Sequence, residues 1–144
     1  MGVYFVGTRQ FVLFKIDSEE YGIDIGRINS IERMMDIFKV PNTPDYIEGL
    51  VNLRGTVHTV FNLRKKFGLP GAAFDDNTKI IMLNTADSIV GIIVDEVKEI
   101  AKVEESQFED VPKELTALRY QYLSGTVKIG SNVVMLLDVD KVLA

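Results

Sequence analysis

The feature of this sequence that most constrains its fold is an internal repeat. With a shift of 69 positions, residues 11–31 align without a gap on residues 80–100. With a shift of 76 positions, residues 46–67 align on residues 122–143. The two registers differ by seven residues, which indicates an insertion in the middle loop of the second copy. Two copies are too few for a solenoid, so we expect two similar small units that pack together.

Chain length and composition indicate a single domain, 1–144, whose core both copies share. Of the 144 residues, 47% are apolar, which suits one compact globular domain. A unit of about 60 residues is only marginally stable by itself. We therefore divide the chain into a first unit at 11–68, a linker at 69–78 and a second unit at 79–143.

Composition also limits which cellular compartment and which classes of partner we expect. The chain has no Cys, which excludes disulfides and thiolate metal sites and fits a reducing compartment. No apolar run approaches the ~18 residues of a membrane span, so we expect a cytoplasmic protein without direct membrane insertion. A net charge of −5 with scattered basic residues argues against nucleic acid as the partner. A protein partner is the remaining class.

An all-β fold is predicted, because short apolar or alternating runs are separated by turn residues. In the first copy the expected strands are 11–16, 21–25, 27–33, 47–53 and 56–61. In the second copy they are 79–83, 89–94, 97–103, 123–129 and 133–137. Each copy thus supplies five short strands.

Short helical turns are expected after the last strand of each copy. Asn62 is placed to cap a single turn that ends at Phe67. Asp138 holds the corresponding position in the second copy, and Asn and Asp are about equally good caps. A further short helix is expected at 113–118, inside the long loop 104–121.

The sequence offers little catalytic chemistry. His58 is the only histidine, and it lies in a predicted strand where no nucleophile–base pair can be assembled around it. The acidic pairs 75–76, 104–105 and 109–110 fall in polar loops, where a solvated surface is favoured over acid–base chemistry. Neither a phosphate-binding glycine loop nor the spacing of a calcium loop occurs. We therefore expect no enzymatic activity, no catalytic residues, no metal and no cofactor.

The copies differ informatively in the turn between their last two strands. The first copy has Asn52, Arg54 and Gly55 there, where the second copy has residues 128–131. The flanking apolar positions agree, so the frame requires only a turn, and the Arg and Asn are additional. A guanidinium on a rigid turn suits bidentate recognition of a carboxylate or a backbone carbonyl in a partner. The alternatives are an intramolecular pair, for instance with Glu32, or simple exposure to solvent.

Five segments of the chain also carry a family resemblance. They are residues 21–25, 40–44, 46–55, 90–95 and 136–143, where 52–55 reads Asn-Leu-Arg-Gly. Each motif is weak alone, but together, in this order and spacing, they resemble the CheW family of bacterial chemotaxis coupling proteins over residues 11–143. The resemblance implies two SH3-like five-stranded β-barrel subdomains around a shared hydrophobic core.

The resemblance also implies a function that the repeat alone does not. It is that of a non-catalytic adaptor between the cytoplasmic tips of chemoreceptors, the methyl-accepting chemotaxis proteins, and the regulatory domain of the histidine kinase CheA. Such an adaptor is expected to be monomeric when free and to join membrane-bound receptor arrays through its partners. Two alternatives stay open: an adaptor of another two-component motility or pilus pathway, and a small-molecule-binding or enzymatic domain that uses the groove between the barrels.

The resemblance further implies a set of partner-binding residues. They are Ile28, Ser30, Gly49, Asn52, Arg54, Gly55, Gly91 and Val97. For Gly49 and Gly91 the alternative is a purely conformational role, because the other copy repeats each glycine. For Ile28 and Val97, which correspond to each other in the repeat, the alternative is core packing.

The chain departs from the family pattern next to the arginine turn. Family members often carry a Glu at the position of Ser30, where it would pair with Arg54. Glu32 lies two residues further on the same predicted strand face. We expect either that Glu32 substitutes as the partner of Arg54 or that Arg54 is left free for the binding partner.

Overall fold

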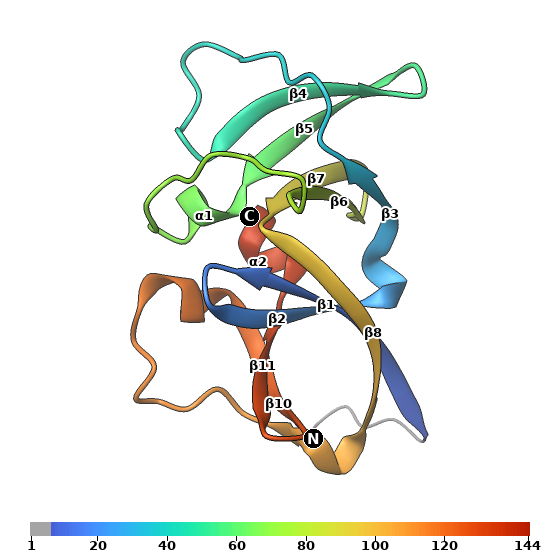
Figure 1. The fold of residues 1–144 in the computed structure, drawn as a ribbon, viewed down its shortest axis with the longest axis vertical. Coiled ribbons are helices and arrows are strands. Elements are labelled where there is room, and N and C mark those ends of the chain that lie inside the picture. Colours follow the sequence, from blue (N-terminus) through green and yellow to red (C-terminus); the bar gives the residue numbers. More distant parts are fainter. Residues whose placement is uncertain (1–6) are drawn as a thin grey trace.

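In the computed structural model, the described residues 7–144 form two curved sheets that lie one above the other (Figure 1). The six-stranded sheet has the order β8-β1-β2-β11-β10-β9. Its strands are β8 (Glu96–Glu104), β1 (Thr8–Ile16), β2 (Glu19–Asp24), β11 (Asn132–Leu137), β10 (Leu123–Ile129) and β9 (Phe108–Glu109). The five-stranded sheet has the order β3-β6-β7-β5-β4. Its strands are β3 (Ile28–Arg33), β6 (Lys79–Asn84), β7 (Ile89–Val94), β5 (Thr56–Asn62) and β4 (Ile47–Leu53).

The predicted all-β architecture of two small SH3-like barrels is confirmed. Strands β4, β7 and β10 have the predicted bounds, and the other expected strands differ only at their ends. The sequence pattern missed β9, which is too short to show alternation. It also missed the 3₁₀ helix η1 (Ile25–Arg27), where the Asp24 carboxylate accepts a hydrogen bond from the Gly26 N–H at 2.8 Å.

The barrels do not correspond to the two copies of the repeat. We expected 11–68 to form one barrel and 79–143 the other, and this partition is wrong. Strands β1 and β2 lie with β8, β10 and β11, whereas β6 and β7 lie with β3, β4 and β5. The η1 turn after β2 carries the chain to the other sheet, and the bend at Asp95 after β7 carries it back. One barrel therefore combines two strands of the first copy with four of the second, and the other combines three strands of the first copy with two of the second.

Two parallel strand pairings hold this exchange in place. Strand β11 pairs with β2 where Leu136 faces Gly22, and β5 pairs with β7 where Val60 faces Gly91. The repeat shifts superpose one pairing on the other. The molecule therefore has a pseudo-twofold topology in which neither copy completes a barrel alone.

Apolar side chains fill three clusters, and the largest lies between the sheets. It contains residues of both sheets and both helical turns, including Phe14, Ile81 and Val142. A smaller cluster around Leu136 belongs to the six-stranded sheet, and another around Val60 belongs to the five-stranded sheet. Each buried large side chain stabilises the fold by about 1.5–3 kcal/mol, so the central cluster is the main link between the barrels. The predicted shared core is confirmed.

Both predicted helical caps are present. Asn62 Oδ1 accepts a hydrogen bond from the Lys65 N–H at the start of α1 (Leu63–Lys66). Asp138 Oδ1 accepts one from the Lys141 N–H at the start of α2 (Val139–Leu143). These single turns place Leu63 and Val142 in the central cluster.

The helix predicted at 113–118 is wrong. That segment holds only a turn, closed by the Leu115 N–H donating to the Pro112 carbonyl at 3.1 Å. Short 3₁₀ helices instead lie at the two ends of the long loop, η2 (Glu105–Gln107) and η3 (Leu118–Tyr122). Contacts made by the η3 side chains with the rest of the fold place this helix, and periodicity in one sequence does not reveal such contacts.

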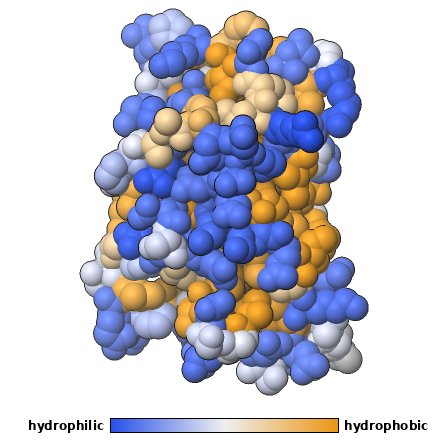
Figure 2. All heavy atoms as spheres, viewed as in Figure 1, coloured by the Kyte–Doolittle hydropathy of each residue, from blue (hydrophilic) through white to orange (hydrophobic). Residues whose placement is uncertain are grey.

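Four of the exposed large apolar residues in the described part of the chain form two pairs related by the repeat. Ile31 and Ile100 are 41% and 56% exposed, and Val57 and Val133 are 57% and 53% exposed. Each barrel presents one residue of each pair. Figure 2 shows one face of the molecule, with a broad polar band and apolar residues reaching the surface along the right-hand side. Exposed apolar groups of this kind are common at protein interfaces.

A hydrogen-bonded cluster ties the long loop to the first hairpin. The Glu19 carboxylate accepts hydrogen bonds from Arg119 Nε at 2.5 Å, from the Tyr120 hydroxyl at 2.5 Å and from the Tyr21 hydroxyl at 3.0 Å. Burial alone would raise the pKa of Glu19, but hydrogen bonds from Arg119, Tyr120 and Tyr21 outweigh it and lower that pKa below 4.5. The loop is therefore held by a carboxylate that must stay ionised.

This cluster predicts an acid-dependent loss of stability. Because the pKa of Glu19 is lower in the folded than in the unfolded protein, ionised Glu19 stabilises the fold above its ordinary value of 4.5. That contribution disappears as the pH falls through the folded-state pKa. Glu19→Gln should cost about 1–3 kcal/mol at neutral pH and flatten the acid limb of the stability curve, measured by urea unfolding.

The matched control is Glu20→Gln, since Glu20 has no ion pair among the described residues. It should leave the acid limb as in the wild type. An unchanged acid limb in Glu19→Gln would contradict the role given to this carboxylate.

Candidate functional site

The β4–β5 hairpin ends in a two-residue turn that displays Arg54. Arg54 and Gly55 both have positive φ, 53° and 85°, as the hairpin turn of type I′ requires. The Asn52 side chain accepts a hydrogen bond from the Gly55 N–H at 3.0 Å. Asn52 therefore stabilises the turn, and the turn fixes where the Arg54 side chain begins.

Arg54 pairs with Glu32 on the neighbouring strand β3. Arg54 Nη2 lies 3.5 Å from Glu32 Oε2, and the Arg54 side chain is 71% exposed while Glu32 is 18% exposed. The prediction that Glu32 substitutes as the partner of Arg54 is confirmed. An ion pair with one exposed partner is worth about 0–1 kcal/mol, so it orients the guanidinium without locking it.

The backbone at Arg54 carries a conformational cost that the fold does not need. A residue with a Cβ in the left-handed region costs about 1–2 kcal/mol relative to Gly. The second copy has Gly130 at the corresponding position, with φ 61°. The second copy therefore forms this turn with Gly130, which avoids the conformational cost, whereas the first copy forms it with Arg54, which does not. Backbone strain of this kind clusters at binding and active sites, so Arg54 is a candidate binding residue.

Ser30 lies beside this pair but does not take part in it. Its hydroxyl is buried and has no hydrogen-bond partner among the described residues. On β3, Ser30 is the cross-strand neighbour of Met82 on β6. Ser30 is therefore too short and too enclosed to reach the guanidinium, which explains why Arg54 turns to Glu32.

Ile28 and Val97 both pack toward the interior of the fold. Ile28 is on β3 of one sheet and Val97 is on β8 of the other, and both are partly buried against the central cluster. Core packing, one of the two alternatives for these residues, is therefore what the structure shows.

Gly49 and Gly91 are buried, and their surroundings explain the absence of a side chain. Gly49 sits at a β-bulge with φ 150°, and an added Cβ would lie 2.3 Å from the Phe38 carbonyl oxygen. At Gly91 an added Cβ would lie 2.9 Å from Ile80 and 3.0 Å from Met82. Both glycines permit close packing within the fold, so direct contact with a partner is not their role.

The structure thus brings together only some of the predicted partner-binding residues. The hairpin tip (Asn52, Arg54, Gly55) and β3 (Ser30, Glu32) come together, whereas Gly49, Gly91 and Val97 lie elsewhere in the fold. Among five surface cavities of about 430–550 Å³, none has Ile28, Arg54 or Val97 in its wall. The left-handed backbone at Arg54 escaped sequence reasoning, although Gly130 at the matching position was an available signal.

Two absences concern only the part of the chain that the structure describes. Within residues 7–144 no helix is long and apolar enough to cross a membrane. Within the same residues no group of three or more His, Cys, Asp or Glu side chains is arranged to hold a metal ion.

The chain is similar to known proteins over nearly its whole length. Residues 10–144 match the family model described as CheW-like domain. The chain is 35% identical to the chemotaxis protein CheW of Klebsiella aerogenes, over 94% of this chain and 82% of that protein. It is 33% identical to CheW of Bacillus subtilis, over 93% and 86% of the two chains, and 32% identical to CheW of Treponema pallidum, over 92% and 80%.

A solved structure gives the same picture for the fold. The crystal structure of the scaffolding protein TtCheW from Thermoanaerobacter tengcongensis superposes with a TM-score of 0.84 at 29% sequence identity. The match covers 91% of this chain and 89% of that chain. The likeness thus extends over both barrels.

The glycine geometry yields a test that separates packing from binding. Gly49→Ala should destabilise the fold by about 2–4 kcal/mol, because the new Cβ meets backbone at a left-handed position. Gly71→Ala is the matched control, since a Cβ there meets nothing within 4 Å and the backbone is ordinary. Urea unfolding of both variants measures the difference. Wild-type stability in Gly49→Ala would contradict the conformational role.

Proposed function

Because this chain belongs to the CheW-like domain family, we propose that it is a non-catalytic adaptor that couples chemoreceptor tips to the histidine kinase CheA. Chemotaxis scaffolding is the role that the names of its relatives state. The coupling itself, the partners and the residues that contact them are our proposal. We further propose that the protein acts in the cytoplasm, is monomeric when free and reaches membrane-bound receptor arrays through its partners.

The observation that carries the proposal is the arginine at the hairpin tip. Arg54 is exposed, sits on a short rigid turn and occupies a left-handed backbone position where the second copy has Gly130. A planar guanidinium presented in this way can donate two parallel hydrogen bonds to a carboxylate or to backbone carbonyls of a receptor helix. The weak pair with Glu32 is easily exchanged for such a partner.

Glu32 has a defined part in this proposal. Being 18% exposed, it is better shielded than Arg54, and it holds the guanidinium above β3 in the free protein. A partner carboxylate would compete with Glu32, whereas a partner carbonyl could join the existing pair. The Ser30 hydroxyl below remains enclosed and contributes shape only.

Two similar barrels suit a protein that holds two partners at once. The exposed pairs Ile31 and Ile100, and Val57 and Val133, place exposed apolar side chains on both barrels. An adaptor that binds receptor and kinase on separate surfaces raises their effective concentration, so modest affinities suffice. A coupling free energy of about 1–3 kcal/mol between the two surfaces would let receptor state bias kinase state.

Charge reversal at the hairpin tip tests the receptor-binding site. Arg54→Glu should stay folded, because an exposed turn substitution usually changes stability by less than about 0.5 kcal/mol. In pull-downs it should lose binding to a receptor signalling tip more than binding to the kinase regulatory domain. The matched control is Lys128→Glu, the same charge reversal on the corresponding β10–β11 hairpin, which should retain the receptor tip. Equal retention of both partners by Arg54→Glu would refute the site.

A second substitution separates function from stability. Arg54→Gly relieves the left-handed backbone but adds freedom to the unfolded chain, so the free energy of unfolding should stay within about 1 kcal/mol of the wild type. Receptor binding, measured by calorimetry with the same receptor fragment, should nevertheless weaken. Unchanged receptor affinity would show that the guanidinium is dispensable.

A further inference from the structure

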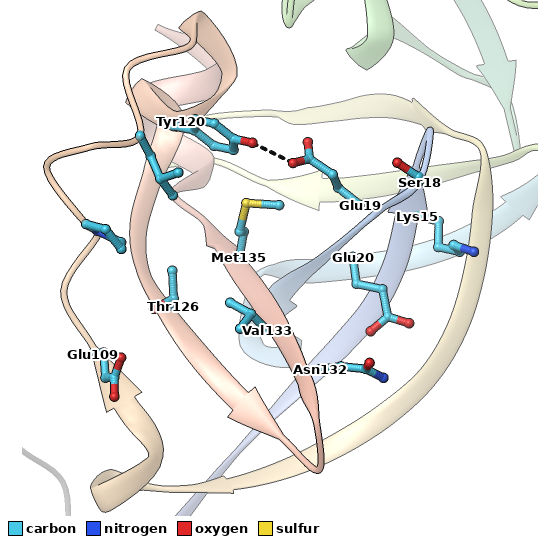
Figure 3. A pocket seen from close by; sticks show the side chains of 12 residues that line it. Lys15, Ser18, Glu19, Glu20, Glu109, Tyr120, Thr126, Asn132, Val133 and Met135 are labelled. Atoms are coloured by element: carbon cyan, nitrogen blue, oxygen red, sulfur yellow. Dashed lines mark hydrogen bonds between the residues drawn. The ribbon is translucent and has the colours of Figure 1, made fainter.

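A cavity of about 500 Å³ lies between the long loop and the outer face of the six-stranded sheet. Figure 3 shows side chains of β2, β10 and β11 on one side of it and, on the other, Glu109 of β9 and the chain that follows it. Cavities of about 300–1,000 Å³ are typical of ligand sites. This one is bounded by the loop that the second copy gained, and it shares no residue with the hairpin-tip site.

The cavity has an apolar lining that is partly open to solvent. Met135 and Leu115 contribute apolar atoms from the sheet and from the loop, and Val133, 53% exposed, lies at its edge. Because this edge and Glu109 are exposed, a side chain can enter while the backbone that carries it stays outside. The shape therefore fits one long side chain of a partner segment.

Two carboxylates at this cavity have no ionic partner. Glu20 and Glu109 form no ion pair with any described residue, whereas Glu19 is already satisfied by Arg119. Lys15 is the one cationic side chain in the wall; it lies directly across the β1–β2 pairing from Glu20 but forms no ion pair with Glu20 or Glu109. With a chain charge of −5, the cavity favours a cationic occupant.

A hydroxyl group also lines the cavity. Thr126 is 4% exposed, lines the cavity and makes no side-chain hydrogen bond with any described residue. This hydroxyl is therefore available to accept a hydrogen bond from a ligand. An ammonium or guanidinium can donate to this hydroxyl as well as to the carboxylates.

The pseudo-twofold topology shows that the fold does not require these charges. In the repeat Glu20 corresponds to Ile89, and Glu109 occupies the edge-covering place that Phe38 occupies on the other barrel. That barrel has a cavity of about 530 Å³ lined by Val57 and Asp87. The Asp87 carboxylate there accepts a hydrogen bond from Thr85. The related cavity thus has one carboxylate, which already has a hydrogen-bond partner, whereas Glu20 and Glu109 have none.

We propose that this cavity binds a lysine or arginine side chain, flanked by apolar residues, of a partner protein segment. The alkyl stem would pack on Met135, Leu115 and Val133, and the charged head would be attracted by the Glu20 and Glu109 carboxylates on the two sides of the cavity. The two adaptor partners need not supply this segment, so the inference is independent of the function proposed above.

The experiment uses isotope-labelled protein and the blocked tripeptide Leu-Lys-Leu, with Leu-Glu-Leu as the matched probe. The lysine peptide should shift the amide resonances of residues 109–120 and 132–135, with a Kd in the millimolar range or below, and the glutamate peptide should not. Glu20→Gln combined with Glu109→Gln should raise the Kd about fivefold or more, and added salt should do the same. Asp87→Asn, in the related cavity, is the matched control and should leave the Kd unchanged.

Three outcomes would overturn the inference. Equal shifts with both peptides would show that charge plays no part. Shifts confined to the Asp87 cavity would place the site on the wrong barrel. Binding of n-hexylammonium as tight as that of the lysine peptide would assign the cavity to a small amine instead of a protein segment.

Discussion

The pairing of strands between the two copies of the repeat is the interaction on which the rest of the molecule depends. Strand β2 pairs in parallel with β11, and β7 pairs in parallel with β5, so each copy completes the barrel that the other begins. Between the sheets, the apolar cluster around Phe14, Ile81 and Val142 couples the barrels. Removing either copy would expose this cluster and leave both barrels open. The chain is therefore one cooperative unit, although its sequence divides into two.

This topology explains how one frame carries different surfaces. Corresponding hairpins, edges and cavities occur twice, so a position where the two copies differ is one where the frame accepts more than one side chain. Arg54 stands where the second copy has Gly130, and Glu20 stands where the second copy has Ile89. In both places a residue that the frame does not need is placed on rigid backbone. Duplication thus supplies an internal control that separates residues serving stability from residues serving recognition.

Much of the fold could be predicted from the sequence, because strand alternation and helix caps are local signals. The strands and the caps at Asn62 and Asp138 belong to this class. The helix expected at 113–118 failed because contacts of Arg119 and Tyr120 with Glu19 place the 3₁₀ helix further along. Of the partner-binding residues expected by resemblance, the structure brings the hairpin tip to β3. It gives Gly49 and Gly91 conformational roles, because neighbouring atoms leave no room for a Cβ.

The sequence by itself determined that the chain is duplicated, predominantly β and built around a common core, because periodicity and self-similarity are properties of the chain alone. It also singled out Arg54 as an addition to the frame. Only the tertiary structure decided which strands of the two copies pair with each other. A parallel pairing between distant strands does not alter the local residue pattern of either strand. The structure likewise decided that Arg54 rests on Glu32 in a left-handed turn. Contacts between residues far apart in sequence depend on how the whole chain packs. Local residue patterns in a single sequence do not reveal that packing.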